Sequence, residues 1–259
     1  MGEAGLSDEA GRSDKGRLFP APEGRLSRTG RKYRLSAVGF LDTLGAKAFA
    51  ANEVFMNALA FMVDRQERIN LTRSDEHPLR TTYFSDNIGA SIVIDGLDDQ
   101  QRQRAVAQVL RLLAGIQLSY LREFAILCRG GVAIGQCFHN GNVLFGPALV
   151  EAYLLEQTAN GPRIALSADV AALSVGDVVP LLSPEPLLGR SSEPLGMAQS
   201  IDFLAAELPP AGPSRRSYIA GLADAIATGT QESADAKVLS KWEWTRQRLE
   251  ALKSDIGMA

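Results

Sequence analysis

Residues 33–45, YRLSAVGFLDTLG, place an aspartate at the end of an apolar strand and follow it with a short Gly-containing turn. A second segment, TTYFSDNIGASIVI at residues 81–94, repeats the pattern, because Asp86 separates two runs of strand-forming residues. Apolar, β-branched and aromatic residues favour strands, whereas Asp, Asn and Gly end them. The sequence therefore predicts that Asp42 and Asp86 each lie at the exit of a strand.

A single aspartate at such a position is a common turn former. Two of them, each in a Gly-containing strand-end segment, favour a pair of hard oxygen ligands for Mg²⁺ or Mn²⁺. Carboxylates on adjacent strand ends can hold two divalent ions against a triphosphate, where the ions activate an attacking oxygen and neutralise the leaving pyrophosphate. We therefore interpret Asp42 and Asp86 as catalytic metal ligands.

The remaining pattern predicts alternating helices and strands. Helix formers at helical spacing, caps, a Pro at a helix start and an Asn-Gly turn predict these elements: strand 33–41, helix 46–70, strands 80–85 and 88–94, a helix capped by Asp98 and ending near 122, strands 125–138 and 142–145, helix 147–158 and strand 163–167. This order predicts an α+β fold, with a ferredoxin-like antiparallel sheet, helices on one face and a C-terminal helical extension.

Composition predicts three segments along the chain. Residues 1–30 are polar and Gly-rich, which is typical of a disordered tail. Residues 31–175 form the folded domain. Residues 176–259 comprise an irregular, Pro-rich arm over 176–215 and a C-terminal helix, whose Trp242 and Trp244 anchor it on the domain or on a dimer partner.

Length and charge limit the class of protein. The chain has 259 residues, 46% of them apolar, and a net charge of −3, which allows one substantial core and gives no case for a nucleic-acid binder. We expect no membrane segment and a reduced cytoplasmic setting, because no run of 18 apolar residues occurs. Cys128 and Cys137 are expected to be buried apolar residues, and His77 and His139 lack partners for a metal or nucleophile site.

Four motifs in order resemble the class III nucleotidyl cyclases. FLDTLG at 40–45 resembles the family's first strand, where an Asp binds both metals, and YFSDN at 83–87 stands where the family has its second metal-binding Asp. RGGVAIG at 129–135 and GPALVEAYLLE at 146–156 stand in place of a glycine-containing strand and the helix that follows it. The resemblance covers about half of the chain and implies that residues 31–175 are a cyclase catalytic domain.

The chain departs from the purine cyclases where they read the base. The position of their base-selecting Lys is Thr82, and that of their second purine-contacting Asp is Pro147. The Asn and Arg that steady the transition state fall on Val150 and Leu154, neither of which can donate a side-chain hydrogen bond. With the metal aspartates retained, this combination resembles the pyrimidine nucleotide cyclases of bacterial antiphage (Pycsar) systems.

That resemblance implies conversion of UTP to 3′,5′-cyclic UMP and pyrophosphate with two Mn²⁺ or Mg²⁺ ions, as a second-messenger synthase in antiphage defence whose product signals to a separate effector. It also implies a homodimer with shared active sites. We include Leu41 with Asp42 and Asp86 in the metal set, and we expect phosphate at the backbone amides of Thr43, Leu44 and Gly45. Alternatives are cyclic CMP from CTP, a silent nucleotide-binding module, or another metal-dependent nucleotidyl transferase.

For several side chains, the sequence leaves two interpretations open. Tyr83, with Thr82, is the candidate for contact with the base, or else a core tyrosine on its strand. Arg129 either faces the phosphates as a catalytic residue or pairs with an acid. Arg163 either replaces the missing transition-state Arg or is exposed to solvent. Glu151 and Glu156 are expected to be helix-surface charges.

Overall fold

The computed structural model describes residues 32–45, 78–159, 161–189 and 192–258, and single residues at 53, 56, 57, 60 and 61. The predicted tail at 1–30 and most of the predicted helix at 46–70 lie outside the described residues. The chain from Tyr33 onward forms one compact unit.

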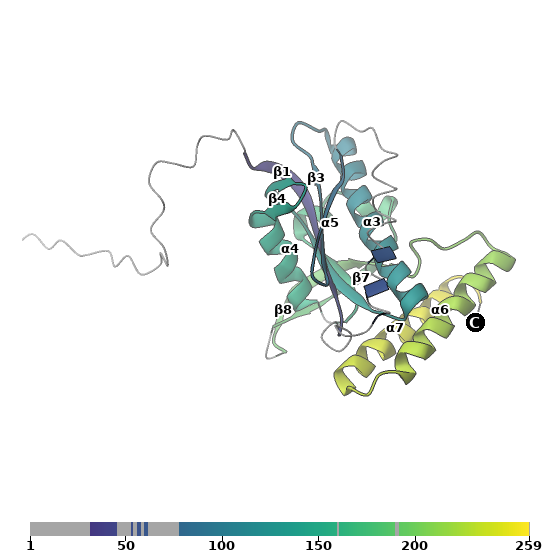
Figure 1. Ribbon diagram of the computed structural model, residues 1–259. Helices are drawn as coiled ribbons and strands as arrows, with labels where there is room; N and C mark the ends of the chain where they lie inside the picture. Colours follow the sequence, from purple (N-terminus) through teal and green to yellow (C-terminus); the bar gives the residue numbers. More distant parts are fainter. Residues whose placement is uncertain are drawn as a thin grey trace, which may run out of the picture. The chain divides into compact units, whose positions relative to one another are not determined.

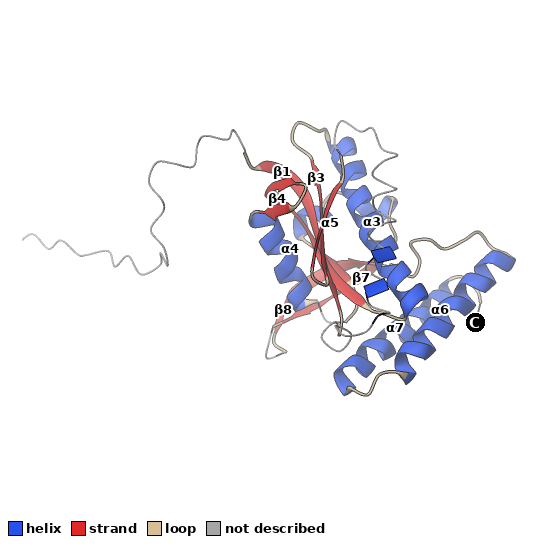
Figure 2. Cartoon of the chain, viewed as in Figure 1, coloured by secondary structure: helices blue, strands red, loops and turns tan. Residues whose placement is uncertain are grey.

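The described residues contain one eight-stranded mixed sheet (Figures 1 and 2). Its order is β2-β3-β1-β4-β6-β8-β7, and β5 pairs with β4 beside this path. Only β4 and β6 run parallel; the other pairs are antiparallel. The strands are β1 (Arg34–Thr43), β2 (Arg80–Phe84), β3 (Asn87–Val93), β4 (Cys128–Asn140), β5 (Val143–Phe145), β6 (Ile164–Leu166), β7 (Leu181–Leu188) and β8 (Pro194–Ile201).

The described helices are α3 (Asp99–Phe124), α4 (Pro147–Thr158), α5 (Ala168–Ala171), α6 (Pro213–Gln231) and α7 (Ala236–Asp255), with a 3-10 turn at Val175–Asp177. Local sequence sets their ends. Asp98 and Gln101 form the expected capping box at the start of α3, in which each side chain accepts a hydrogen bond from the other residue's N–H. Pro147 occupies the first turn of α4, where its missing N–H costs nothing.

The predicted α+β fold with a C-terminal helical extension is confirmed, but helices cover both faces of the sheet rather than one. Successive residues of β1 point to opposite faces. Leu41 and Ala37 pack in the main core with α3, whereas Val38 and Phe40 pack with Ala148 and Ala152 of α4. Figure 1 shows α3 and α4 on opposite sides of the sheet. The sheet is mostly antiparallel, as expected, with one parallel pair, because β6 follows the α4 crossover and pairs parallel with β4.

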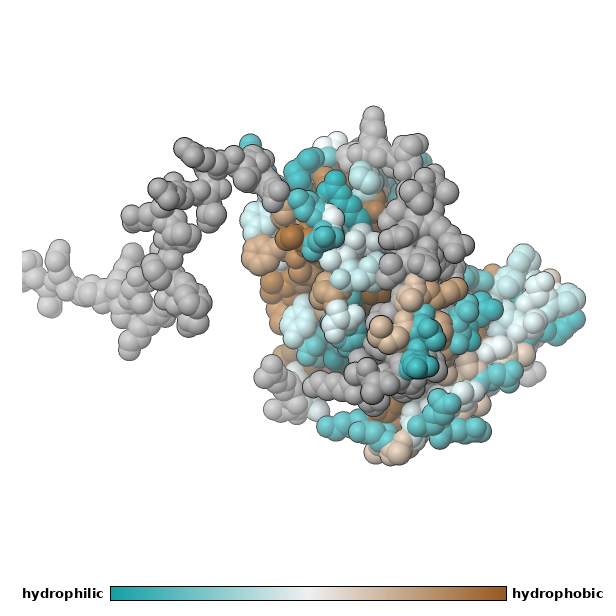
Figure 3. All heavy atoms as spheres, viewed as in Figure 1, coloured by the Kyte–Doolittle hydropathy of each residue, from teal (hydrophilic) through white to brown (hydrophobic). Residues whose placement is uncertain are grey.

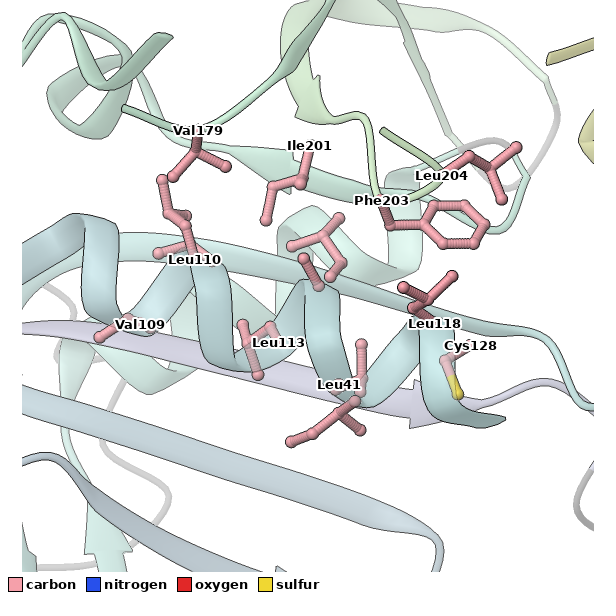
Figure 4. Packing of buried hydrophobic residues seen from close by; sticks show 14 of the residues in the cluster. Leu41, Val109, Leu110, Leu113, Leu118, Cys128, Val179, Ile201, Phe203 and Leu204 are labelled. Carbon is pink, nitrogen blue, oxygen red and sulfur yellow. The ribbon is translucent and has the colours of Figure 1, made fainter. Parts of the chain in front are cut away.

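The core between α3 and the sheet is built from fully buried aliphatic side chains. Figure 4 shows Leu110 and Leu113 of α3 among Leu41 of β1 and Ile201 of β8, with Phe203 beyond β8 at one end of the cluster. Tyr218 and Leu222 of α6 are part of the same cluster, and α6 contacts α3. The C-terminal extension therefore shares the core of the domain.

The segment 176–215 is not irregular as expected. It contains β7 and β8, which pair with each other and join the sheet through the contact of Ala165 in β6 with Ser200 in β8. Prolines are typical of irregular segments, yet Pro184 and Pro186 lie in the edge strand β7 and Pro194 is the first residue of β8, and a missing N–H is tolerated at both kinds of position. Among the described residues, no helix is both long and apolar enough to cross a bilayer.

Helix α4 approaches β4 closely at Gly131. A Cβ added there would lie 2.1 Å from the main-chain oxygen of Ala152, which cannot move without moving the helix. We expect Gly131→Ala to lower the free energy of unfolding by about 1–3 kcal/mol through overpacking. Urea unfolding followed by circular dichroism measures the change.

Gly221→Ala is the matched control, since nothing lies within 4 Å of its added Cβ and Gly221 is inside α6. A helical Gly→Ala change at an open position raises stability by up to about 1 kcal/mol. Equal stability of the Gly131→Ala variant and the wild type would contradict the close approach of α4.

Candidate active site

Asp42 and Asp86 are brought to the same end of the sheet. Asp42 lies on the central strand β1, opposite Asn87 of β3 on one side and Arg129 of β4 on the other. Asp86 occupies the two-residue turn that joins β2 to β3. The hydroxyl of Thr43 donates to the Asp86 carbonyl over 3.0 Å, which ties the end of β1 to this turn. The two carboxylates are close enough that the charge of Asp86 acts on Asp42.

The turn also orients the Asp86 carboxylate. Its Oδ1 accepts a hydrogen bond from the hydroxyl of Ser85 over 2.9 Å and lies 3.4 Å from the side-chain amide nitrogen, Nδ2, of Asn87. Ser85 adopts a left-handed backbone conformation with φ 58°, which is uncommon for a residue other than Gly, Asn or Asp. Local strain of this kind clusters at functional sites.

Arg129 connects Asp42 to a second acid that the sequence interpretation missed. Its Nη2 lies 3.7 Å from Asp42 Oδ2, and its Nε contacts the carboxylate of Glu156. Glu156, in the last turn of α4, is fully buried, so its expected place on the helix surface is wrong. A signal was present: Glu156 follows Ala148 and Ala152 at a spacing of four, on the stripe of α4 that faces the sheet.

Burial raises the pKa of the Glu156 carboxyl to about 7, and the positive charge of Arg129 opposes the shift only in part. The pKa of Asp42 is also raised, chiefly by its burial, with Arg129 acting in the opposite direction and Asp86 in the same direction. Glu156 and Asp42 each shift the pKa of the other, so they titrate as a coupled pair.

The expected phosphate cradle is only partly available. The N–H of Leu44 donates to the carbonyl of Leu127 over 2.8 Å, and its side chain is buried, so this amide is used in strand pairing rather than free for phosphate. The side chain of Thr43 is buried as well, bonded to the Asp86 turn. Gly45 lies in the turn that follows β1 and has a positive φ of 83°. The helix expected after it lies outside the described residues.

Leu41 fits its expected metal role poorly. Its side chain is 1% exposed and packs in the main core. Its backbone pairs with Ile88 on one side and Gly130 on the other. Its carbonyl is therefore inside the paired part of the sheet, which argues against Leu41 as a ligand.

Thr82 and Tyr83 do not share one base pocket, because consecutive strand residues point to opposite faces. The hydroxyl of Thr82 donates to the carbonyl of Gly141 over 2.5 Å and lies 2.7 Å from Nε2 of His139. Nδ1 of the same imidazole lies 2.7 Å from the hydroxyl of Ser91. Tyr83 packs against the main core instead.

This network fixes His139 as a neutral structural residue. Burial lowers the pKa of His139 to about 4, and the charge of Arg80 adds to the shift. Thr82 is therefore enclosed by the hydrogen bonds around His139.

Arg163 is neither a free cation nor exposed. Its side chain is 1% exposed and its Nη1 lies 3.1 Å from Glu185 of β7. Its Nη2 also donates to the carbonyl of Pro186 over 2.5 Å. Arg163 therefore joins the strand β7 to the rest of the sheet, and it is excluded as a replacement for a transition-state arginine.

Lys241 of α7 is a further charged residue at this end of the sheet. Its charge acts on Asp42, on Glu156 and on Arg129. No motif pointed to it, because it lies about two hundred residues after Asp42 and only the docking of α7 brings it there.

The protein supplies only part of the set of ligands that a divalent ion needs. Within the ranges that the structure describes, no three His, Cys, Asp or Glu side chains are grouped to hold a metal by themselves. Mg²⁺ is usually held by one or two carboxylates together with substrate phosphates and water. Asp42 and Asp86 supply that number of carboxylates.

No protein-family model and no curated protein matches the chain. It is similar to three solved structures, among others. The adenylyl cyclase CyaB from P. aeruginosa has 15% identity, covering 66% of this chain and 95% of that one, at TM-score 0.48. A guanylyl cyclase domain of the RhoGC fusion protein from Blastocladiella emersonii has 14% identity, with coverages of 66% and 94%, at 0.46.

An adenylate cyclase from Trypanosoma brucei in its monomeric state has 15% identity, covering 65% of this chain and 90% of that one, at TM-score 0.46. At these identities and scores, no activity follows from the likeness.

Glu156 makes the stability of the fold depend on pH. The folded protein keeps the Glu156 proton up to about pH 7, whereas the ordinary pKa is 4.5, so the folded state binds more protons between these values. Its contribution to stability is present below about pH 4.5 and is lost as pH rises through 7. The free energy of unfolding of the wild type minus that of Glu156→Gln should therefore fall over this window.

Urea unfolding at steps of pH measures the difference. Both proteins contain His139, so its own titration cancels. Glu123→Gln, which removes an exposed acid on α3, is the control and should give a constant difference. A constant difference for Glu156→Gln as well would contradict the buried, raised carboxyl.

Proposed function

We propose that this chain is a metal-dependent nucleotide cyclase. The observation that carries the proposal is the meeting of Asp42 and Asp86 at one end of the sheet, beside Arg129. The motifs around these residues resemble those of the class III cyclases in order and in placement. In the proposed reaction, the 3′-oxygen of a ribose attacks the α-phosphorus of the same nucleotide and pyrophosphate leaves.

Asp42 and Asp86 would hold two Mn²⁺ or Mg²⁺ ions. Bound there, the ions would supply charge neutralisation for the triphosphate and acidify the 3′-hydroxyl. The protein's own side chains hold the proposed metal ligands in position. Ser85 orients the Asp86 carboxylate, and Arg129 holds Asp42 while keeping one cation near the leaving group. Glu156 holds Arg129 in place through its side-chain contact.

We propose a pyrimidine substrate, UTP in preference to CTP, with 3′,5′-cyclic UMP as product. Thr82 is enclosed by His139 and Gly141 rather than free to read a purine. Val150 and Leu154, at the positions of the transition-state Asn and Arg, are 55% and 54% exposed and apolar. By resemblance, we further propose a role in antiphage defence, where the product signals to a separate effector.

We also propose a homodimer with shared active sites. Exposed apolar side chains gather on α4 and beside it, and Figure 3 shows a brown patch over the place of this helix. Tyr33, Phe145, Val150 and Leu154 line a shallow apolar groove there. A contiguous apolar face of this kind marks a protein interface. A partner's residues would then replace the groups that α4 lacks.

A silent nucleotide-binding module is the second candidate. It is favoured by the outward, apolar Val150 and Leu154 and by the engagement of Arg129 with Glu156. The retained aspartate pair favours turnover.

The reaction is tested by incubating the purified protein with each radiolabelled nucleoside triphosphate and Mn²⁺ or Mg²⁺. Phosphatase treatment then leaves cyclic monophosphates intact. We expect a resistant product from UTP, and from CTP under the alternative. A resistant product from ATP or GTP alone would contradict the pyrimidine assignment, and none from any nucleotide would favour the silent module.

Asp42→Asn and Asp86→Asn should each reduce product formation by at least about 100-fold while the protein stays folded. Loss of an outer-shell partner of a metal already costs about 10–100-fold, and these residues are proposed as direct ligands. Asp99→Asn is the matched control, because its side chain is 95% exposed at the start of α3. Rates of product formation and thermal unfolding are compared for all three. Full activity in either site variant would overturn the two-metal assignment.

A further inference from the structure

The C-terminal helix α7 is held firmly against the domain. The ring of Trp242 packs where Gly229 of α6 has no side chain; an added Cβ there would lie 2.1 Å from the ring. The indole N–H of Trp242 donates to the hydroxyl of Ser233 over 3.1 Å. Farther along α7, Arg248 forms an ion pair with the buried Asp202, which follows β8. The residue that precedes Trp242 is therefore held in a defined place.

That residue is Lys241, which lies at the edge of the candidate site, near the end of β1. It lines a small cavity of about 30 Å³ together with Leu44 at the exit of β1, Leu127 before β4, and Ser233 and Trp242 of the α6–α7 region. Leu44 is only two residues after Asp42. Lys241 is thus beside the end of β1, at the candidate phosphate segment.

The ammonium group of Lys241 has no ion pair with any residue that the structure describes. Burial lowers the pKa of Lys241, and the charge of Arg129 lowers it further. A partly buried cation without a partner costs stability, and such groups cluster at functional sites.

The charges of the site indicate what would satisfy Lys241. Arg129 and Glu156 contact each other. Asp235, Asp42 and Glu156 are the acids whose charges act on Lys241, and divalent ions bound to Asp42 and Asp86 would offset the negative charge of that pair. Ions bound to Asp42 and Asp86 would add positive charge near that of Lys241. A chain of phosphate groups is the ligand that fits, since lysine binds phosphate as a compact point charge.

We propose that Lys241 binds the polyphosphate tail of the substrate, so that the C-terminal helix pair is part of the active site rather than an appended support. The inference rests on the proposed function, because it takes a nucleoside triphosphate as the ligand. It goes beyond it by assigning the tail of that ligand to a residue from α7.

Inorganic tripolyphosphate with Mn²⁺ is the probe, because it has the tail and neither base nor reactive ribose. The two tryptophans of the chain are Trp242 and Trp244, both on α7 beside Lys241, so their fluorescence reports binding directly. We expect Lys241→Met to weaken binding about 10- to 100-fold, the loss typical of a hydrogen bond to a charged group. Lys241→Arg keeps the charge and should stay within about fivefold of wild type.

Lys237→Met is the matched control, since Lys237 is exposed one turn earlier on the same helix, and it should bind as wild type does. Lys241→Gln serves in place of Lys241→Met if thermal unfolding shows that the latter does not fold. An unchanged dissociation constant in the Met or Gln variant, an equal loss in Lys237→Met, or no binding by the wild type would each overturn the inference.

The nucleotide assay separates this result from the proposed function. Selective loss of tripolyphosphate binding in a protein that makes no cyclic product would support Lys241 and overturn the cyclase proposal. A protein that makes cyclic product at the same rate and KM with Met or Gln at position 241 would retain the cyclase proposal and overturn the role of Lys241.

Discussion

The pairing of β1 with β3 on one side and β4 on the other is the constraint on which the site depends. Its register sets Asp42 opposite Asn87, and hence next to the Asp86 turn, and at the same time opposite Arg129. A slip of one residue would turn Asp42 toward the opposite face and remove this meeting. The register is specified strongly because β1 is buried on both faces, by α3 on one and by α4 on the other.

At this end of the sheet, acidic and basic side chains lie close together and offset each other's charge only in part. Arg129 lies between Asp42 and Glu156, and the burial of Glu156 is costly unless it keeps a proton or an ion pair. Helix α4 therefore has two functions in the structure. Its inner stripe supplies Glu156 to the site, and its outer face leaves Val150 and Leu154 exposed. The two aspartates proposed as metal ligands thus lie at strand ends, whereas the outer face of α4 is apolar.

Most elements of the fold could be predicted because local sequence specifies them. The strands around Asp42 and Asp86, the cap at Asp98 and the helix after Pro147 all follow from residues within a few positions. The placement of helices on both faces could not be predicted, because it depends on which side of β4 the crossover through α4 takes. The strands β7 and β8 were missed because their prolines are typical of loops, and an edge of a sheet tolerates them.

The sequence by itself determined the two strand-end aspartates and the order of the elements that carry them, since the period of apolar residues and the turn residues act over short distances. Only the tertiary structure decided which side chains meet there. Glu156 is buried because α4 docks on Gly131, Thr82 is enclosed because β4 supplies His139, and Lys241 reaches the site because α7 docks beside it. These contacts join residues about 20 to 200 positions apart, where packing rather than local preference sets the neighbours.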